Sequence, residues 1–140
     1  MAIRSALEVA HEAVFPHGAF VTGPVEAVFE FKDGKRSEHQ KVDENTGLRV
    51  WSVPVLDGDP ELKGASKAVK VTLLAEVQPV PPDALPQVPM ELRPVEFQGV
   101  TAVAYCAEVM KGRFKVAWSI KARGMKAPGK RPPQPHPQAA

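Results

Sequence analysis

The residues that most often carry catalysis or bind metals are few in this chain, and their spacing is poor. Its histidines are His11, His17, His39 and His136, and no two of them are four residues apart. None has a cysteine or carboxylate at the spacing of a metal site. We therefore expect isolated surface or loop histidines, and no metal.

A cluster of acids resembles the start of a calcium-binding loop. It consists of Asp57, Asp59 and Glu61, but Leu62 stands where such a loop needs glycine. Ala68 stands where the bidentate acid belongs. A solvated acidic turn fits these residues better than a calcium site.

The sequence also contains no pattern typical of a catalytic nucleophile. The single cysteine, Cys106, lies in an apolar run and is expected to be structural, and it cannot form an internal disulfide. No glycine-rich phosphate loop follows a predicted strand, and there is no G-x-S-x-G elbow. The sequence predicts a protein that is not an enzyme and has no cofactor.

Positive charge, in contrast, is strongly segregated. Residues 111–140 carry eight basic residues and no acid, whereas residues 1–110 carry ten basic and sixteen acidic residues. A segregated basic region attracts phosphates in a way that a mixed surface does not. Because these charges begin inside a predicted strand, a binding face is favoured over a merely solubilising tail.

Five segments have the composition of β-strands. In the last of them apolar residues alternate strictly with basic and small ones, so one face is apolar and the other basic. Glycines at 23 and 99 suggest bulges in the first and fourth segments, and Pro54 predicts an edge or bulge in the second. The segments are Ala19 to Phe31, Leu48 to Leu56, Ala68 to Val77, Val95 to Cys106 and Arg113 to Arg123.

This strand order predicts a mainly β fold, a five-stranded OB-like barrel over residues 1–125. An SH3-like barrel or a small β-sandwich would give a similar pattern. Residues 2–14 could form a short helix or a further edge strand, and six prolines make 78–94 a Pro-rich loop. Residues 126–140 are expected to form a disordered, basic, Pro-rich tail.

Barrels of this kind hold single strands in a basic groove with aromatic rings on which bases stack. Candidate stacking residues are Trp51, Tyr105 and Phe31, although Trp51 and Trp118 are better explained as core residues. The basic residues are therefore the stronger candidates. They are Lys70, Arg113, Lys115, Lys121 and Arg123 on strands, Arg49 beside Trp51, and Lys35, Arg36 and Lys41 in the first long loop.

Several stretches resemble a known family. They are FPHGAFVTGPVEAV, KVDENTGLRVWSVPVLDGDPE, QPVPP, VEFQGV and the final S-x-K-A-R-G-M-K-A-P, together spanning about 15–128. This pattern is similar to the replication-activator (Pra-type) proteins of actinobacterial integrating conjugative plasmids. The resemblance implies a small accessory protein that promotes replication and excision of its element. A shorter stretch, D-x-x-T-G-x-x-V-W-x-V from Asp43 to Val53, resembles phage single-strand-binding proteins with OB folds.

These observations favour a DNA-binding accessory protein with single-stranded DNA as its partner. The alternative is a protein–protein interaction module that regulates a replication initiator without contacting nucleic acid. A homo-oligomer is left open, including a second subunit at the Pro54 edge. No apolar run approaches the roughly 20 residues that span a bilayer, and the N-terminus does not read as a signal peptide, so a cytoplasmic protein is expected.

Overall fold

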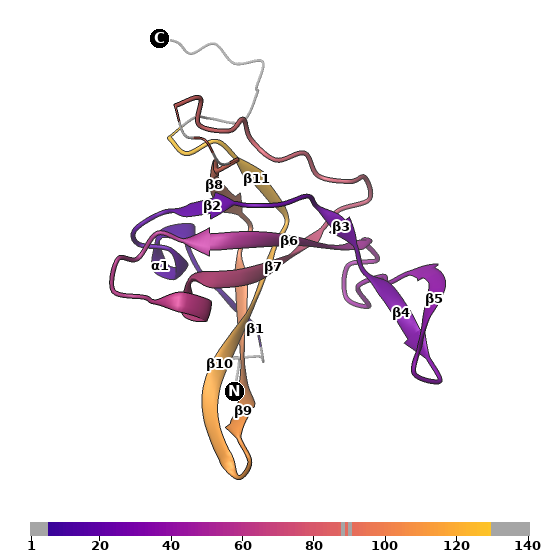
Figure 1. Ribbon diagram of the computed structural model, residues 1–140. Helices are drawn as coiled ribbons and strands as arrows, with labels where there is room; N and C mark the ends of the chain where they lie inside the picture. The colour runs from indigo at the N-terminus through magenta and orange to yellow at the C-terminus, as the bar shows by residue number, and fades with distance from the viewer. Residues whose placement is uncertain (1–5, 88, 90, 130–140) are drawn as a thin grey trace.

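The computed structural model describes residues 6–87, 89 and 91–129, and its elements are almost all β-strands (Figure 1). The prediction of a mainly β fold is confirmed. Most strands belong to one nine-stranded sheet with the order β1-β9-β10-β7-β6-β2-β8-β11, to which β3 adds by pairing with β6. Strands β4 and β5 form a separate hairpin. The predicted tail from residue 130 onward lies outside the described residues.

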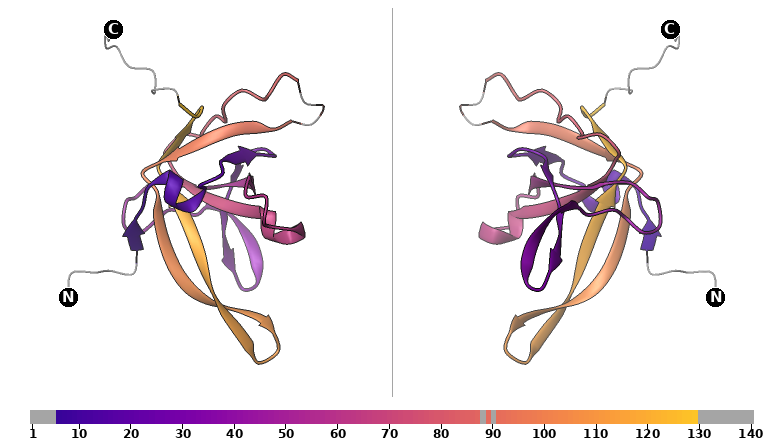
Figure 2. Two further views of the ribbon diagram at one scale, coloured as in Figure 1. Left: turned by 90° about the vertical axis from the view of Figure 1, so that its left-hand side faces the viewer. Right: turned by 90° about the vertical axis from the view of Figure 1, so that its right-hand side faces the viewer.

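The predicted OB-like barrel is not confirmed in its details. Within the described residues, β1 and β11 stand at opposite ends of the strand order and do not pair. The sheet therefore remains open, and two hairpins, β4–β5 and β9–β10, project from its body (Figures 1 and 2). Two of the five expected strands are also interrupted along their length.

The first expected strand, 19–31, is one of these. The Gly23-Pro24 pair interrupts it, and its last part turns away from the sheet to pair with a strand from the predicted polar loop. Asp33 and Gly34 make the turn with positive φ angles of 53° and 75°. The resulting elements are β2 (Ala19–Val21), β3 (Glu26–Ala27), β4 (Phe29–Lys32) and β5 (Lys35–Gln40).

The fourth expected strand, 95–106, is the second of the two interrupted strands. It is divided at Gly99, whose φ of 61° only glycine adopts readily and whose α-carbon lies against the side chain of Arg123. The chain bends here without reversing, because Gln98 pairs with Gly124 and Thr101 with Lys121 in one continuous antiparallel register. The bend that the sequence predicts at Gly99 is therefore present. The two halves are β8 (Arg93–Gln98) and β9 (Thr101–Met110), which pair with the consecutive strands β11 and β10.

Three of the remaining strands, β6, β7 and β10, match predicted ones, whereas the sequence predicts no strand at β11. These four strands are β6 (Val50–Asp57), β7 (Ala68–Leu74), which follows the short 3-10 helix η1 (Gly64–Lys67), β10 (Arg113–Ala122) and β11 (Gly124–Lys126). Strand β11 pairs with β8, so regular structure extends one residue beyond the expected boundary at 125. The Pro-rich segment joins β7 to β8, and regular structure resumes at Arg93.

Pro54 does not mark an edge of the sheet. Strand β6 pairs with β7 on one side, and on the other with β2 from Val55 and with β3 up to Ser52. Pro54 sits in the gap between β2 and β3, where a missing N–H costs no strand pairing. Gly23 fills this gap, since a Cβ there would lie 2.7 Å from the Pro54 ring.

The N-terminal segment contains both of the expected alternatives. Strand β1 (Ala6–Glu8) pairs with β9, and the single-turn helix α1 (His11–Val14) follows it. The start of the expected helix, residues 2–5, lies outside the described residues. No helix in the part of the chain that the structure describes is long and apolar enough to cross a bilayer.

The core lies on one face of the central strands. It is built from β-branched and leucine side chains of β2, β6, β7 and β8, and Phe15 and Phe97 extend it toward α1. The fully buried side chains are those of Leu73, Val21, Val53, Val55, Val71 and Val95. The opposite face of the same strands is polar, and it carries the candidate site.

Candidate nucleic-acid interface

The polar face is positioned by three neighbouring strands, β6, β7 and β10. Thr72 of β7 lies opposite Ser52 on one side and opposite Lys121 of β10 on the other. Residues that are directly paired across a sheet share a face, and so do residues two apart along a strand. Lys70 therefore lies on this face with Lys121, although the two are 51 positions apart in the sequence.

The β9–β10 hairpin continues this face outward. Lys115 pairs with Ala107, Ala117 with Tyr105, and Ser119 with Val103, so Lys115 and Tyr105 lie on the same face as Lys121. The sheet is polar here because the alternation of β10 directs its basic residues away from the core. We call the set Lys70, Tyr105, Lys115, Ser119 and Lys121 the β7–β10 surface.

A hollow in this surface gives it a concave shape. Its lining includes Lys70, Tyr105, Ser119 and Lys121, and no acidic side chain. The hollow forms because β7 and β10 pair only at two positions, Thr72–Lys121 and Leu73–Ala122, and then diverge. Two lysines, a hydroxyl and two exposed aromatic rings, those of Tyr105 and Trp118, thus line one concavity that is open to an extended ligand.

A second hollow adjoins the first and shares Lys70, Ser119 and Lys121 with it. It extends along β4, where Phe31 lines it, to Lys41, which directly follows β5. This hollow also contains acids, so its charge is mixed. They are Glu30, Asp43 and Glu44. The acid-free half of the groove is therefore the half beside the β9–β10 hairpin.

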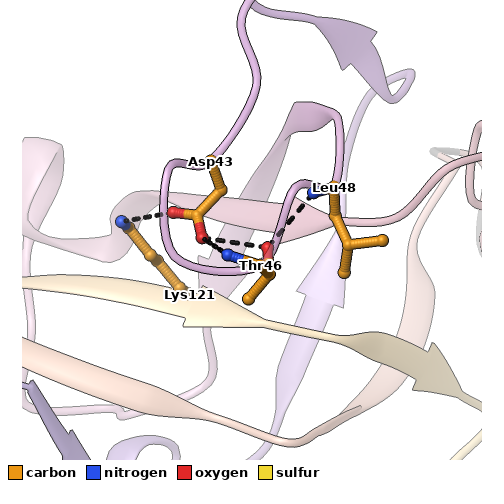
Figure 3. Close-up of polar contacts among 4 residues, drawn as sticks. All are labelled: Asp43, Thr46, Leu48 and Lys121. Atoms are coloured by element: carbon orange, nitrogen blue, oxygen red, sulfur yellow. Dashed lines mark hydrogen bonds and ion pairs between the residues drawn. The ribbon is translucent and has the colours of Figure 1, made fainter.

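One of these acids is tied to the site by a compact turn (Figure 3). The carboxylate of Asp43 accepts hydrogen bonds from the Thr46 N–H at 3.0 Å and the Thr46 hydroxyl at 2.9 Å. The Thr46 hydroxyl oxygen in turn accepts from the Leu48 N–H at 3.2 Å. The D-x-x-T-G stretch, noted in the sequence for its resemblance, thus builds a self-bonded loop.

The other carboxylate oxygen of Asp43 lies 3.6 Å from the Lys121 Nζ. Burial raises the pKa of Asp43, whose side chain is only 10% exposed, but the Thr46 hydrogen bonds and the Lys121 charge outweigh burial. The net result is a pKa below the ordinary value of 3.8. Asp43 is therefore ionised at neutral pH and fixes the position of Lys121. Sequence reasoning did not propose it as a site residue.

The structure divides the expected aromatic residues. Phe31 is 72% exposed and Tyr105 is 51% exposed, so both present ring surface to solvent. Trp51 is buried, and its indole N–H donates to the Ala75 carbonyl at 2.8 Å. Trp51 is therefore wrong as a stacking residue, and its interpretation as a core residue is confirmed. Trp118, also expected in the core, is instead 54% exposed.

Several expected basic residues lie away from the β7–β10 surface. Lys35 and Arg36 lie in the β4–β5 hairpin, where the Arg36 guanidinium carbon is 4.1 Å from the centre of the Phe29 ring. Arg113 stands at the turn end of the β9–β10 hairpin, next to a register shift in the pairing.

Two further expected residues flank the 43–48 loop. Arg49 is exposed and forms an isolated antiparallel β-bridge with Val42. Arg123 lines a different hollow, together with Glu8 and Asp43. The structure therefore brings together Lys70 and Lys121, with Lys41 lining the adjoining hollow, and places Lys115 farther out on the same face.

Within residues 6–87, 89 and 91–129, no three His, Cys, Asp or Glu side chains cluster in a way that could hold a metal ion. Comparison with known proteins gives no relative: no family model, no curated protein and no solved structure matches this chain.

Proposed function

We propose that this protein binds single-stranded DNA on the β7–β10 surface, without catalysing a reaction. The observation that carries the proposal is the acid-free hollow in which Lys70 and Lys121 from adjacent strands lie with the exposed ring of Tyr105. Lysines attract phosphates, and an exposed aromatic ring gives a base a surface to stack on. A groove of this kind suits an extended strand better than a compact molecule.

The biological setting that we propose comes from the resemblance to replication-activator proteins of mobile elements. A small single-strand binder would act there as an accessory factor, protecting or presenting DNA exposed during replication and excision. The acids of the second hollow repel phosphates. They therefore favour binding of the DNA strand on the acid-free side, beside the β9–β10 hairpin.

Salt dependence of binding to a fluorescent oligonucleotide tests the proposal. Each phosphate contact to a single strand contributes a slope of about −0.7 in a plot of log K against log salt. The variant Lys70→Gln should bind more weakly and lose about one such contact. Lys126→Gln is a matched control, because it removes the same charge from β11, where Lys126 is paired with Glu96 at 3.4 Å.

Equal behaviour of the two variants would contradict a site on the β7–β10 surface. Absence of salt-sensitive binding by the unaltered protein would contradict the proposal itself. It would favour the alternative, a protein-interaction module, for which Val80 of the Pro-rich segment and the preceding Val77 offer exposed apolar side chains, at 81% and 78% exposure.

A further inference from the structure

The β9–β10 hairpin carries an apolar stripe that nothing in the described structure covers. Ile120 and Ala122 of β10 are buried in the core, and the residues that continue their face outward are exposed. Phe114, Val116 and Trp118 are 62%, 64% and 54% exposed. Three large apolar side chains in a row on one strand face are unusual for a surface that meets only water.

The same part of β10 also has an unpaired backbone edge. Its pairing with β9 runs along the whole strand, but pairing with β7 begins only at Lys121. Among the residues that the structure describes, 113–120 therefore have a partner strand on one side alone, where the hairpin projects from the sheet (Figure 2). A free edge with an apolar face is a ready template for pairing with another strand.

We propose that this edge pairs antiparallel with the same edge of a second copy, about a two-fold axis at Val116. Such an interface is self-complementary, as two-fold symmetry requires. Residue 113 of one copy then lies opposite 119 of the other, so pairing spans 113–119 and fits inside the free edge. Val116 meets its own copy, and Phe114 of each copy meets Trp118 of the other.

The charges on β10 select this register. Two antiparallel copies that keep their faces aligned can be centred on any residue from Phe114 to Trp118. Centring on 114 opposes Arg113 to Lys115, centring on 115 opposes two copies of Lys115, and centring on 118 opposes Lys115 to Lys121. Centring on 117 opposes Arg113 to Lys121, which already pairs with β7. Centring on Val116 opposes no two cations within the free edge, which would be destabilising, and it places Arg113, the first residue of the strand, opposite 119, clear of the edge that β7 occupies.

The dimer bears on the proposed function, because the second copy's strand would lie beside Trp118 and Ser119, which also line the hollow between β7 and β10. A second copy and a bound oligonucleotide would therefore compete for that side of the hollow. A two-fold axis perpendicular to the sheet keeps equivalent faces on one side. The β7–β10 surfaces of both copies would then lie on one continuous sheet, with the six apolar side chains of the two stripes gathered on the other.

A charge at the axis tests the interface. We expect the purified full chain to associate reversibly, as suits an interface of modest area, with a mass that rises toward twice the monomer's in sedimentation equilibrium over a range of concentrations. Val116→Arg should weaken association more than tenfold, because it opposes two arginines and removes the central apolar contact. Tyr105→Arg, on the other face of the same hairpin, should leave it unchanged.

The circular dichroism spectra of both variants should match that of the unaltered protein, since both positions are exposed. A chain that is monomeric throughout, or one whose association Val116→Arg leaves intact, would overturn the proposal. Both outcomes are read from mass, so they are distinct from failure of oligonucleotide binding.

Cysteine crosslinking tests the register. Residues paired across antiparallel strands have Cα atoms about 4.5–5.5 Å apart, which a disulfide can bridge. The double variant Val116→Cys, Cys106→Ser should therefore form a disulfide-linked dimer on mild oxidation. The unaltered chain is its control, because Cys106 is exposed on β9 and pairs with Val116, three strand spacings (about 14 Å) from its symmetry mate. Faster crosslinking of the unaltered chain would overturn the edge-to-edge arrangement.

Discussion

The backbone N–H of Phe97 donates a hydrogen bond of 3.0 Å to Nδ1 of His11, a residue 86 positions earlier in the chain. Strand β2 pairs with β8 only up to Val95, so the imidazole takes the place of a strand partner beyond the end of β2. The ring also packs against Phe15 and Phe97, with centroids 5.5 and 5.9 Å away, and these two rings pack against each other at 6.1 Å. His11 therefore fastens the N-terminal segment to the sheet, and the expectation of an isolated surface histidine is wrong for it.

This contact predicts a pH-dependent stability. Burial lowers the pKa of His11 below 6.5, and the opposing effect of Glu96 and Glu12 does not restore it. Below pH 6.5 the unfolded chain then takes up the proton more readily than the folded one. The stabilisation that His11 provides is complete above pH 6.5 and is lost as the pH falls from there toward the folded-state pKa.

Urea denaturation at pH 7.5 and 5.5 measures this effect. His11→Phe should remove the acceptor, cost about 1–3 kcal/mol at pH 7.5 and reduce the difference between the two pH values. His17→Gln, at an exposed position, should behave like the unaltered protein. A pH dependence that survives His11→Phe in full would assign it to other groups.

Mutation of the buried Trp51 and of the exposed Tyr105 should affect different properties, stability for the first and oligonucleotide binding for the second. Trp51→Phe leaves the Ala75 carbonyl without its donor and should lower the free energy of unfolding by about 1–3 kcal/mol, with little effect on oligonucleotide affinity. Tyr105→Ala should do the reverse and weaken binding by about 1–3 kcal/mol, the value of one stacked base. Denaturation and fluorescence anisotropy on the same two variants give both readings, and a stability loss in Tyr105→Ala would contradict its exposed placement.

Gly99 offers a prediction about the break between β8 and β9. An alanine there would adopt a positive φ and also place its Cβ 2.9 Å from Cγ of Arg123. Gly34 is a matched control, because its φ of 75° carries a similar backbone penalty while nothing lies within 4 Å of the added carbon. We expect Gly99→Ala to lower the thermal midpoint by more than Gly34→Ala. Equal losses would show that the side chain of Arg123 moves aside freely.

The sequence predicts the strand face on which a side chain lies better than it predicts which strands pair with one another. Strict alternation in 113–123 correctly places Lys115 and Lys121 on one face and Phe114, Val116 and Trp118 on the other, because side-chain direction in a strand is local. That Lys70 meets Lys121 depends on a parallel pairing of β7 with β10, which no local pattern specifies. Alternation also says nothing about what covers a face, which is why Trp118 was expected in the core and is instead exposed.

The same distinction explains the missed strands and the missed acid. Strand β5 consists of polar, charged residues and has no buried face, so only its hairpin pairing with β4 makes it a strand. The role of Asp43 beside Lys121 arises from a loop that folds back over β10, and its spacing to Thr46 predicts the turn but not the ion pair.

Asp43 leads to a last prediction, in which stability and binding change in opposite directions. Asp43→Asn removes the charge beside Lys121 and weakens the hydrogen bonds to Thr46, which should cost about 1 kcal/mol of stability. Because the pKa of Asp43 is depressed in the folded state, the stabilisation it provides is present above pH 3.8 and is lost as the pH falls through the folded-state value. The variant should therefore be less sensitive to acid in this range.

Asp43→Asn should also bind oligonucleotide more tightly, since Lys121 is released from its acid and one repulsive charge leaves the groove. Glu91→Gln is a control that removes an exposed acid paired with Arg93, outside the groove. Tighter binding in both variants would reflect net charge alone, whereas tighter binding in Asp43→Asn alone would identify Lys121 as a phosphate-contacting residue.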